Sequence, residues 1–142
     1  NNTNNSNRPQ INMGPSGAND TTFIINNTIT GNPNLDQVGG IAFSSFLGLD
    51  ANVVISENEI VNNRYGIAVI GNNITAFIAG NILNDNNTQG EPLLGGSGIN
   101  LNSTTESTAV LTANTITGNL WGVTIQGNFM VNMGDDDAEN QN

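Results

Sequence analysis

Aliphatic residues hold fixed positions among polar ones in four short segments of the form N-x-[IL]-x-x-N. The segments cover residues 27–32, 58–63, 81–86 and 114–119. Two positions are always aliphatic. The first lies three residues before the first asparagine of the segment, and the second lies two residues after that asparagine. The first column contains Ile24, Ile55, Ile78 and Leu111, and the second contains Ile29, Ile60, Leu83 and Ile116. A pattern that recurs in register four times indicates a repeat architecture.

A second unit, G-[IV]-x-[FVLI], follows each segment and begins at Gly40, Gly66, Gly98 and Gly122. Its period of two is typical of a strand with one buried face. One repeat therefore contains a strand before the first asparagine, a strand between the two asparagines and a strand after the glycine. The shortest repeat, Asn58 to Asn81, spans 23 residues, and no long stretch keeps the 3.6-residue period of a helix. The sequence predicts an all-β parallel β-helix of about four rungs, with three short strands per rung.

The conserved spacing also predicts how the rungs stack. The aliphatic columns, including a third one made of Ile41, Ile67, Ile99 and Val123, are expected to form one continuous core. The asparagines are expected at the corners, because asparagine tolerates the left-handed backbone conformation. The amide of each is also expected to bond with backbone groups or with the asparagine one rung above.

The segments "ISENEIVNNRYGIAVIGN" and "LTANTITGNLWGVTIQGN" resemble the repeats of right-handed parallel β-helix proteins of the pectate-lyase-like superfamily. The resemblance covers roughly residues 21 to 128 and implies a right-handed β-helix. That superfamily includes polysaccharide lyases, hydrolases, epimerases, phage tail spikes, adhesins and other surface proteins. The resemblance therefore implies a fold and does not select a reaction.

The expected organisation has three parts. Residues 1–20 form an asparagine-rich segment that is either disordered or a partial rung, residues 21–128 form the β-helix, and residues 129–142 form an incomplete rung with an acidic tail. Neither end shows an amphipathic helix that would cap the stack, and solenoids normally need caps. We expect a piece of a longer β-helix, or a chain that associates with other copies through its uncapped ends.

Composition narrows the chemistry. The chain has 12 acidic and 2 basic residues, no His, no Cys and a net charge of −10, so it has neither an imidazole base nor a thiolate nucleophile nor the usual zinc ligands. Two cations cannot form the patch that binds nucleic acid or anionic lipid, and the apolar runs are too short to insert in a membrane. The acidic run 135–137 with Glu139 resembles a calcium-binding cluster, but a run of this kind is more typical of a solvated tail. No cofactor is predicted.

No catalytic residue is predicted either. By the resemblance, lyases of this fold use Lys and Arg, often with calcium, whereas glycoside hydrolysis needs convergent carboxylates. The acids in the rungs do not gather at adjacent positions: Asp20, Asp36, Asp50, Glu57, Glu59, Asp85, Glu91 and Glu106. We expect a non-catalytic scaffold, secreted or at the cell surface, that serves in adhesion or binds a neutral glycan. The alternative is a portion of a polysaccharide-degrading or polysaccharide-modifying enzyme.

One corner of the stack differs from the others. The second asparagine and the glycine are 3 residues apart in the second and fourth repeats, but 8 and 12 apart in the first and third, so two loops leave from the same corner. Insertions on one edge of a solenoid often form its binding surface. The expected carbohydrate-binding residues at this corner are Asp36, Arg64, Tyr65, Glu91 and Trp121. The alternative is that both rings cover the loops or pack on the rim of the core.

Overall fold

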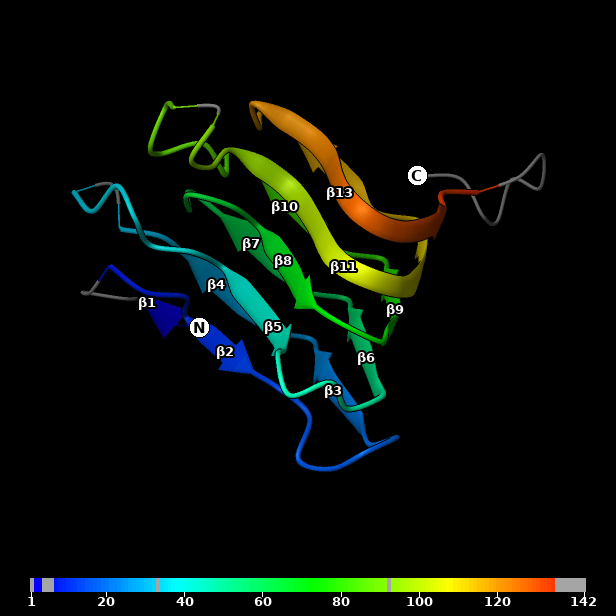
Figure 1. Cartoon of the computed structure of the whole chain (residues 1–142). Helices are drawn as coiled ribbons and strands as arrows, with labels where there is room; N and C mark the ends of the chain where they lie inside the picture. Colours follow the sequence, from blue (N-terminus) through cyan, green and yellow to red (C-terminus); the bar gives the residue numbers. More distant parts are fainter. Residues whose placement is uncertain (1, 4–6, 33, 92, 135–142) are drawn as a thin grey trace.

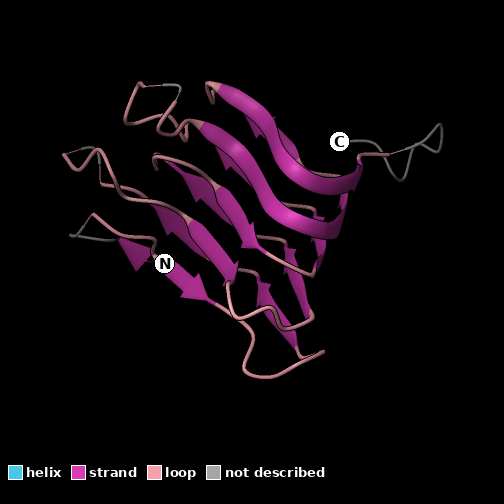
Figure 2. Ribbon diagram, in the orientation of Figure 1, coloured by secondary structure: helices cyan, strands magenta, loops and turns pink. Residues whose placement is uncertain are grey.

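The structure, a computed structural model, describes residues 2–3, 7–32, 34–91 and 93–134. Every strand pair in this part of the chain is parallel, and no helix occurs in it (Figures 1 and 2). The chain winds past three faces in turn and completes about four rungs. The expected fold class, an all-β parallel β-helix with three strands per rung, is confirmed.

Each face is a stack of strands from successive rungs. The first face contains β2 (Ile11–Met13), β5 (Ile41–Ser45), β8 (Ile67–Gly71) and the first halves of β11 (Ser97–Thr112) and β13 (Trp121–Asn132). The second face contains β3 (Thr21–Ile25), β6 (Ala51–Ser56), β9 (Ile74–Ala79) and the second halves of β11 and β13. The third face contains β1 (Asn2–Thr3), β4 (Thr28–Thr30), β7 (Glu59–Val61), β10 (Ile82–Asn84) and β12 (Thr115–Thr117).

The corner between the first and second faces changes along the stack. In the earlier rungs the two faces use separate strands, whereas β11 and β13 bend around this corner without a break, with a register shift between Ser103 and Ser107. The bend of these two strands is visible in Figure 1. The first and second faces therefore belong to one continuous sheet in the last rungs.

The predicted aliphatic columns line the interior. Ile24, Ile55, Ile78 and Leu111 are buried and paired in register, as are Ile41, Ile67 and Ile99. Val123 is half-buried, because β13 pairs on one side only within the described part of the chain. Side chains that alternate inward and outward along each strand explain why a period of two located these positions.

The two corners that bound the third face carry columns of asparagine. Asn27, Asn58, Asn81 and Asn114 stack at one corner, and Asn63, Asn86 and Asn119 stack at the other. At Asn81, Oδ1 accepts bonds from the backbone N–H (3.0 Å) and Nδ2 (2.9 Å) of Asn58. The Nδ2 of Asn81 donates to the Ile55 carbonyl and to Oδ1 of Asn114, both at 2.9 Å. The expected amide stacking is confirmed, and it pairs backbone groups that the turn would otherwise leave unsatisfied inside the corner.

The expectation that these asparagines themselves adopt the left-handed conformation is wrong. The residue immediately before each of the seven ladder asparagines has that conformation instead, with φ between 53° and 65°: Asn26, Glu57, Asn62, Gly80, Asp85, Ala113 and Gly118. A ladder asparagine must point its amide into the corner. The preceding residue therefore adopts the left-handed conformation that turns the chain. The neighbour points outward, and this explains why the position accepts Glu57 and Ala113 despite a conformational cost of about 1–2 kcal/mol.

Replacing Ile67 by Asp should unfold the protein. Ile67 is fully buried between Ile41 and Ile99, and an unpaired buried charge costs several kcal/mol, a large part of the stability of a domain. Circular dichroism and thermal melting test this, with Ile82→Asp at an outward position that is 48% exposed as the control. A melting temperature of Ile67→Asp equal to that of the control would contradict the assignment of the core.

Replacing Asn81 by Ala should cost more than a typical polar substitution. The change leaves the buried backbone N–H of Asn58 and the carbonyl of Ile55 without their partners, at roughly 1–3 kcal/mol for each group. Chemical denaturation should show the loss, and Asn52→Ala at a half-buried outward position should change stability by only about 0.5 kcal/mol. Equal effects for the two variants would mean that the ladder does not stabilise the fold.

Candidate functional site

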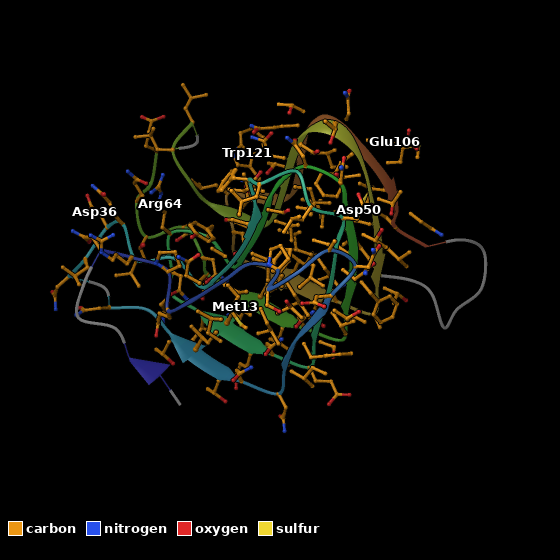
Figure 3. The ribbon with its side chains drawn as sticks, turned by 60° about the horizontal axis from the view of Figure 1, so that its bottom comes forward. Met13, Asp36, Asp50, Arg64, Glu106 and Trp121 are labelled. Atoms are coloured by element: carbon orange, nitrogen blue, oxygen red, sulfur yellow. The ribbon has the colours of Figure 1, made fainter. Side chains whose placement is uncertain are left out.

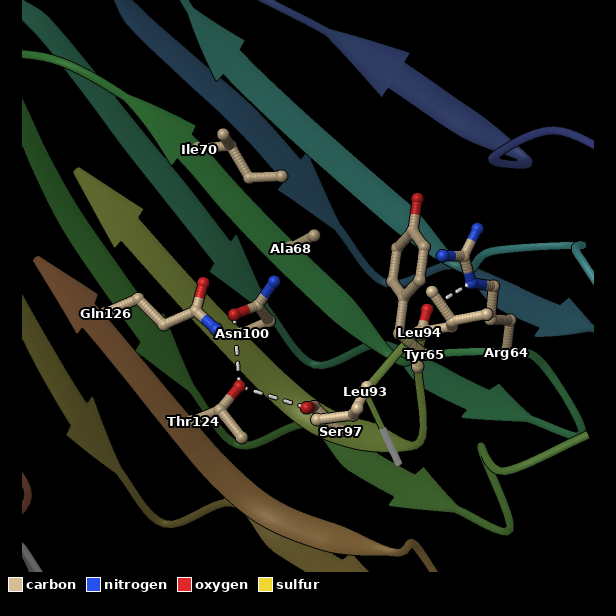
Figure 4. A pocket seen from close by; sticks show the side chains of 11 residues that line it. Arg64, Tyr65, Ala68, Ile70, Leu93, Leu94, Ser97, Asn100, Thr124 and Gln126 are labelled. Carbon is tan, nitrogen blue, oxygen red and sulfur yellow. Dashed lines mark hydrogen bonds between the residues drawn. The ribbon is translucent and has the colours of Figure 1, made fainter. Parts of the chain in front are cut away.

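A groove of about 430 Å³ lies on the outer side of the first face, where residues 87–91 and 93–96 form a loop beside the sheet (Figure 4). We call it the first-face groove. Its lining residues are Arg64, Tyr65, Ala68, Ile70, Leu93, Leu94, Gly95, Ser97, Asn100, Thr124 and Gln126. Strands β8, β11 and β13 supply the floor, and the loop supplies the leucine wall. The groove therefore exists only because the third rung carries the long insertion.

The floor of the groove is graded from apolar to polar. Ala68, Asn100 and Thr124 form one outward column, because Asn100 pairs with both of the others in register. Thr124 Oγ1 donates a hydrogen bond of 3.0 Å to Asn100 Oδ1. A second hydrogen bond of 3.0 Å joins the hydroxyl groups of Thr124 and Ser97, and dashed lines in Figure 4 mark both bonds. These bonds use the oxygen of Asn100 and leave its Nδ2 without a partner among the described residues.

A second free donor lies in the neighbouring outward column. Gln126 Oε1 accepts a bond of 2.9 Å from Asn102 Nδ2, so Gln126 Nε2 is left without a partner in the described part of the chain. Both free amide groups belong to residues that line the same groove. The groove can therefore donate hydrogen bonds to a ligand without breaking a bond of its own.

Tyr65 forms part of the groove wall and packs over the preceding rung. A Cβ at Gly39 would lie 2.3 Å from Cζ of Tyr65, so only glycine leaves room for the ring. Burial raises the pKa of the Tyr65 phenol to about 12, with a smaller opposing effect of the Arg64 charge. The phenol is therefore neutral at physiological pH and acts as a hydrogen-bond donor or acceptor, not as a base.

Arg64 connects both loops of the irregular corner. Its backbone N–H donates to the Val38 carbonyl at 2.7 Å, and its Nε donates to the Leu94 carbonyl at 2.6 Å. Gly95 lies so close that a Cβ there would be 2.6 Å from Cγ of Arg64. The side chain of Arg64 is thus held by one loop, and its terminal guanidinium nitrogens form no hydrogen bond with the described residues.

The other three residues predicted for the site lie outside the groove lining. Trp121 lies on the rung after that of Ser97, pairs with it in register and is 48% exposed. Asp36 and Glu91 are exposed, one on each of the two loops. Glu91 Oε1 accepts a bond from the Leu93 N–H, and the Glu91 carbonyl accepts one from the Leu94 N–H. Glu91 therefore shapes its own loop. Of the predicted set, the structure brings only Arg64 and Tyr65 into the groove.

Sequence reasoning missed the polar floor. Asn100, Thr124 and Gln126 occupy the outward positions between the aliphatic residues that identified the strands. The period of two that located the core also locates these residues, and reading the outward positions as a second ladder would have found them.

A second concavity, of about 420 Å³, lies at the corner between the first and second faces. Asn73 precedes Ile74, and its N–H and Oδ1 both bond with Thr105 Oγ1. On either side of it are two carboxylates: Asp50 precedes Ala51, which pairs with Ile74, and Glu106 precedes Ser107, whose Oγ accepts a bond from the Ile74 N–H. Both carboxylates line this concavity, and Figure 3 shows them well away from Asp36 and Arg64. The spacing of the repeats did not reveal that these two carboxylates line one concavity, because the corner segments before β6, β9 and the second half of β11 differ in length.

The described residues contain no group of three or more His, Cys, Asp or Glu side chains able to hold a metal ion. The acidic run 135–137 with Glu139, which resembles a calcium-binding cluster in sequence, lies outside the described residues. Among the described residues there is also no helix with the length and apolar character needed to cross a membrane.

Neither a protein-family model, nor a curated protein, nor a solved structure matches this chain. The residues of the groove and the charge of the molecule are therefore the features from which a function can be inferred.

Alkaline titration should report the packing of Tyr65 directly, because the chain has one tyrosine. Ultraviolet absorbance of tyrosinate should give a pKa of about 12 in the folded protein and about 10 in denaturant. Since the unfolded state ionises first, the contribution of Tyr65 to folding stability should be constant below pH of about 10 and fall as pH rises toward about 12. A folded-state pKa near the ordinary value would show that the ring is solvated and free to stack on a ligand.

Proposed function

We propose that this protein is a non-catalytic β-helix scaffold of the pectate-lyase-like kind that binds a neutral carbohydrate in the first-face groove. The observation that carries the proposal is the pair of free amide donors, Asn100 Nδ2 and Gln126 Nε2, on a groove floor beside apolar walls. Carbohydrates present hydroxyl oxygens on their edges and C–H groups on their faces. A polar floor with an apolar wall complements both surfaces.

Charge favours a neutral ligand over an anionic one. The chain has a net charge of −10, which repels polyanions, and Arg64 is the only cation that lines the groove. The guanidinium of Arg64 is positioned by Leu94 and serves as a donor to hydroxyl oxygens. Trp121, one rung beyond Ser97 and 48% exposed, extends the site as a stacking surface for a longer oligosaccharide.

The groove chemistry also favours binding over catalysis. Its lining includes no carboxylate, and the raised pKa of Tyr65 makes the phenol a poor base at neutral pH. Glycoside cleavage needs a proton donor and a base or nucleophile at the reacting bond. Binding needs only the donors and apolar surface that the groove presents.

We also propose that the protein is extracellular or lies at the cell surface, where a glycan-binding scaffold serves in adhesion. We further propose that it associates through the ends of its stack, with other copies or with further β-helix. The end of the described stack supports this part, since Ile125 of β13 is 44% exposed and Val123 is half-buried. A further rung would cover both side chains.

One observation favours the enzyme alternative. Asp50 directly precedes β6 and Glu106 lies in β11, two strands away in the same sheet, and both line one concavity; at the spacing of neighbouring strands their backbones are roughly 10 Å apart. Inverting glycosidases place their two carboxyl groups at a separation of about 6.5–9.5 Å. Release of reducing ends from a neutral polysaccharide, abolished by Asp50→Asn, would favour an enzyme over the scaffold.

Trp121→Ala and Asn100→Ala should each weaken binding of a neutral oligosaccharide several-fold. Loss of the ring removes about 1 kcal/mol beyond area burial, and loss of the amide removes a donor of about 0.5–1.5 kcal/mol. A glycan array with and without Ca²⁺ would identify the oligosaccharide, and isothermal titration calorimetry would compare the variants.

The matched control is Phe46→Ala, which removes an aromatic ring that is 71% exposed and lies outside the groove. All three variants should keep the melting temperature of the parent protein within a few degrees. If Asn100→Ala and Trp121→Ala bind the oligosaccharide as tightly as the control, the groove is not the binding site.

A further inference from the structure

The free amide of Asn100 lies beside an apolar part of the first-face groove. Asn100 pairs in register with Thr124 on one side and with Ala68 on the other, so its side chain lies between a polar neighbour and an apolar one. The Oδ1 of Asn100 accepts the bond from Thr124 Oγ1, and Figure 4 shows Nδ2 on the side of Ala68. The backbones of Asn100 and Ala68 are about 4.8 Å apart at the spacing of adjacent strands. A hydrogen-bond donor and an apolar surface are therefore direct neighbours.

The small size of Ala68 leaves a recess at this point. Ala68 lies between Tyr65 and Ile70 along the chain, and the two larger side chains lie on either side of it in Figure 4. All three residues line the groove, and Ala68 is only 3% exposed. Ala68 is thus the bottom of a recess with apolar sides, which fits a substituent of the size of a methyl group.

The free donors of the floor are amide groups. Thr124 uses its hydroxyl hydrogen in the bond to Asn100, so Ser97 is the donor in the bond that joins Ser97 to Thr124, because a hydroxyl group has one hydrogen. Asn100 Nδ2 and Gln126 Nε2 remain. Gln126 is next to Asn102 in its column, whereas Asn100 is next to Ala68. Of the two free amides, Asn100 is the one with an apolar neighbour in its column.

A donor beside a recess of this size fits an acetamido group. The carbonyl oxygen of that group accepts hydrogen bonds without carrying a charge. Its methyl group is attached to the carbonyl carbon, so the acceptor and the apolar part are adjacent, as the donor and the recess are. A hydroxyl group accepts the bond but cannot fill the recess. A carboxylate accepts it too, but the net charge of −10 repels an anionic ligand.

We propose that the first-face groove selects neutral glycans that contain N-acetylated amino sugars. Asn100 Nδ2 donates to the acetamido carbonyl, and the acetamido methyl group lies over Ala68. The exposed side chains of Leu93 and Leu94 cover the C–H face of the sugar ring, and Gln126 Nε2 donates to a hydroxyl oxygen. This inference rests on the proposed carbohydrate-binding function and names the class of sugar that the groove prefers.

Isothermal titration calorimetry with two matched trisaccharides tests the preference. Tri-N-acetylchitotriose and cellotriose have the same linkage and ring configuration, and they differ only in the acetamido or hydroxyl group at carbon 2 of each ring. Both are uncharged, so the charge of the protein does not distinguish them. The parent protein should bind the acetylated trisaccharide about tenfold more tightly, because only that ligand buries a methyl group beside a bonded carbonyl.

Asn100→Asp removes the donor with little change of shape. Thr124 can still donate to one carboxylate oxygen, but the other oxygen replaces Nδ2 and repels the acetamido carbonyl. The preference for the acetylated trisaccharide should fall to about twofold or less, since the bond that distinguishes the two ligands is lost. The matched control is Asn12→Asp, which adds the same charge in the same outward column, two strands beyond Ala68 and outside the groove lining. It should keep the preference of the parent protein.

Two results would overturn this inference and leave the proposed function in place. The first is a parent protein that binds cellotriose as tightly as the acetylated trisaccharide. The second is an Asn100→Asp protein that keeps the full preference. A parent protein that binds neither trisaccharide, and no neutral glycan on the array, would overturn the proposed function as well.

Nuclear magnetic resonance locates the acetamido group without a variant, so it does not depend on the folding of Asn100→Asp. In the complex of isotopically labelled parent protein with tri-N-acetylchitotriose, nuclear Overhauser effects should connect the acetyl methyl protons with the methyl groups of Ala68 or Ile70. Effects that reach only side chains outside the groove lining would place the acetyl group elsewhere and overturn the inference.

Discussion

The asparagine ladders are the interactions on which this fold depends. A solenoid with short strands must turn sharply at every corner, and each turn places backbone N–H and carbonyl groups where no neighbouring strand pairs with them. Asn58, Asn81 and Asn86 are almost fully buried at these corners. The amide of each supplies one acceptor and two donors, which matches what the corner backbone lacks. No aliphatic side chain satisfies these groups, and a carboxylate would bring an unpaired charge.

The ladders also explain where variation is tolerated. Because each asparagine bonds with its equivalents one rung away, the corner keeps its geometry whatever lies between them in the chain. The interval between bonded asparagines is 23 residues at Asn58 and 33 at Asn81, and the geometry of the two links is the same. The extra residues leave the body as a loop at the irregular corner. Arg64 fastens the two loops there through Val38 and Leu94.

The groove is the consequence of combining a regular sheet with an irregular loop. The sheet provides outward residues in straight columns, so that Asn100 lies between Ala68 and Thr124, and the loop adds an apolar wall at one side. Bonds within the columns occupy the oxygen atoms of Asn100 and Gln126. Their nitrogen atoms are left as donors. The chemistry of the site thus derives from the same ladder arrangement that stabilises the interior.

The sequence alone determined the fold class, the three strands per rung, the interior columns such as Ile24 to Leu111 and the ladder asparagines. These features repeat at fixed offsets, and a side chain's direction along a strand depends only on its parity. Tertiary structure decided the remaining features. The ring of Tyr65 lies over Gly39, the left-handed residues precede the asparagines, and Asp50 and Glu106 line one concavity. Each of these depends on the register between rungs of unequal length and on the space left by a neighbouring rung, and neither quantity is encoded in the period of a single strand.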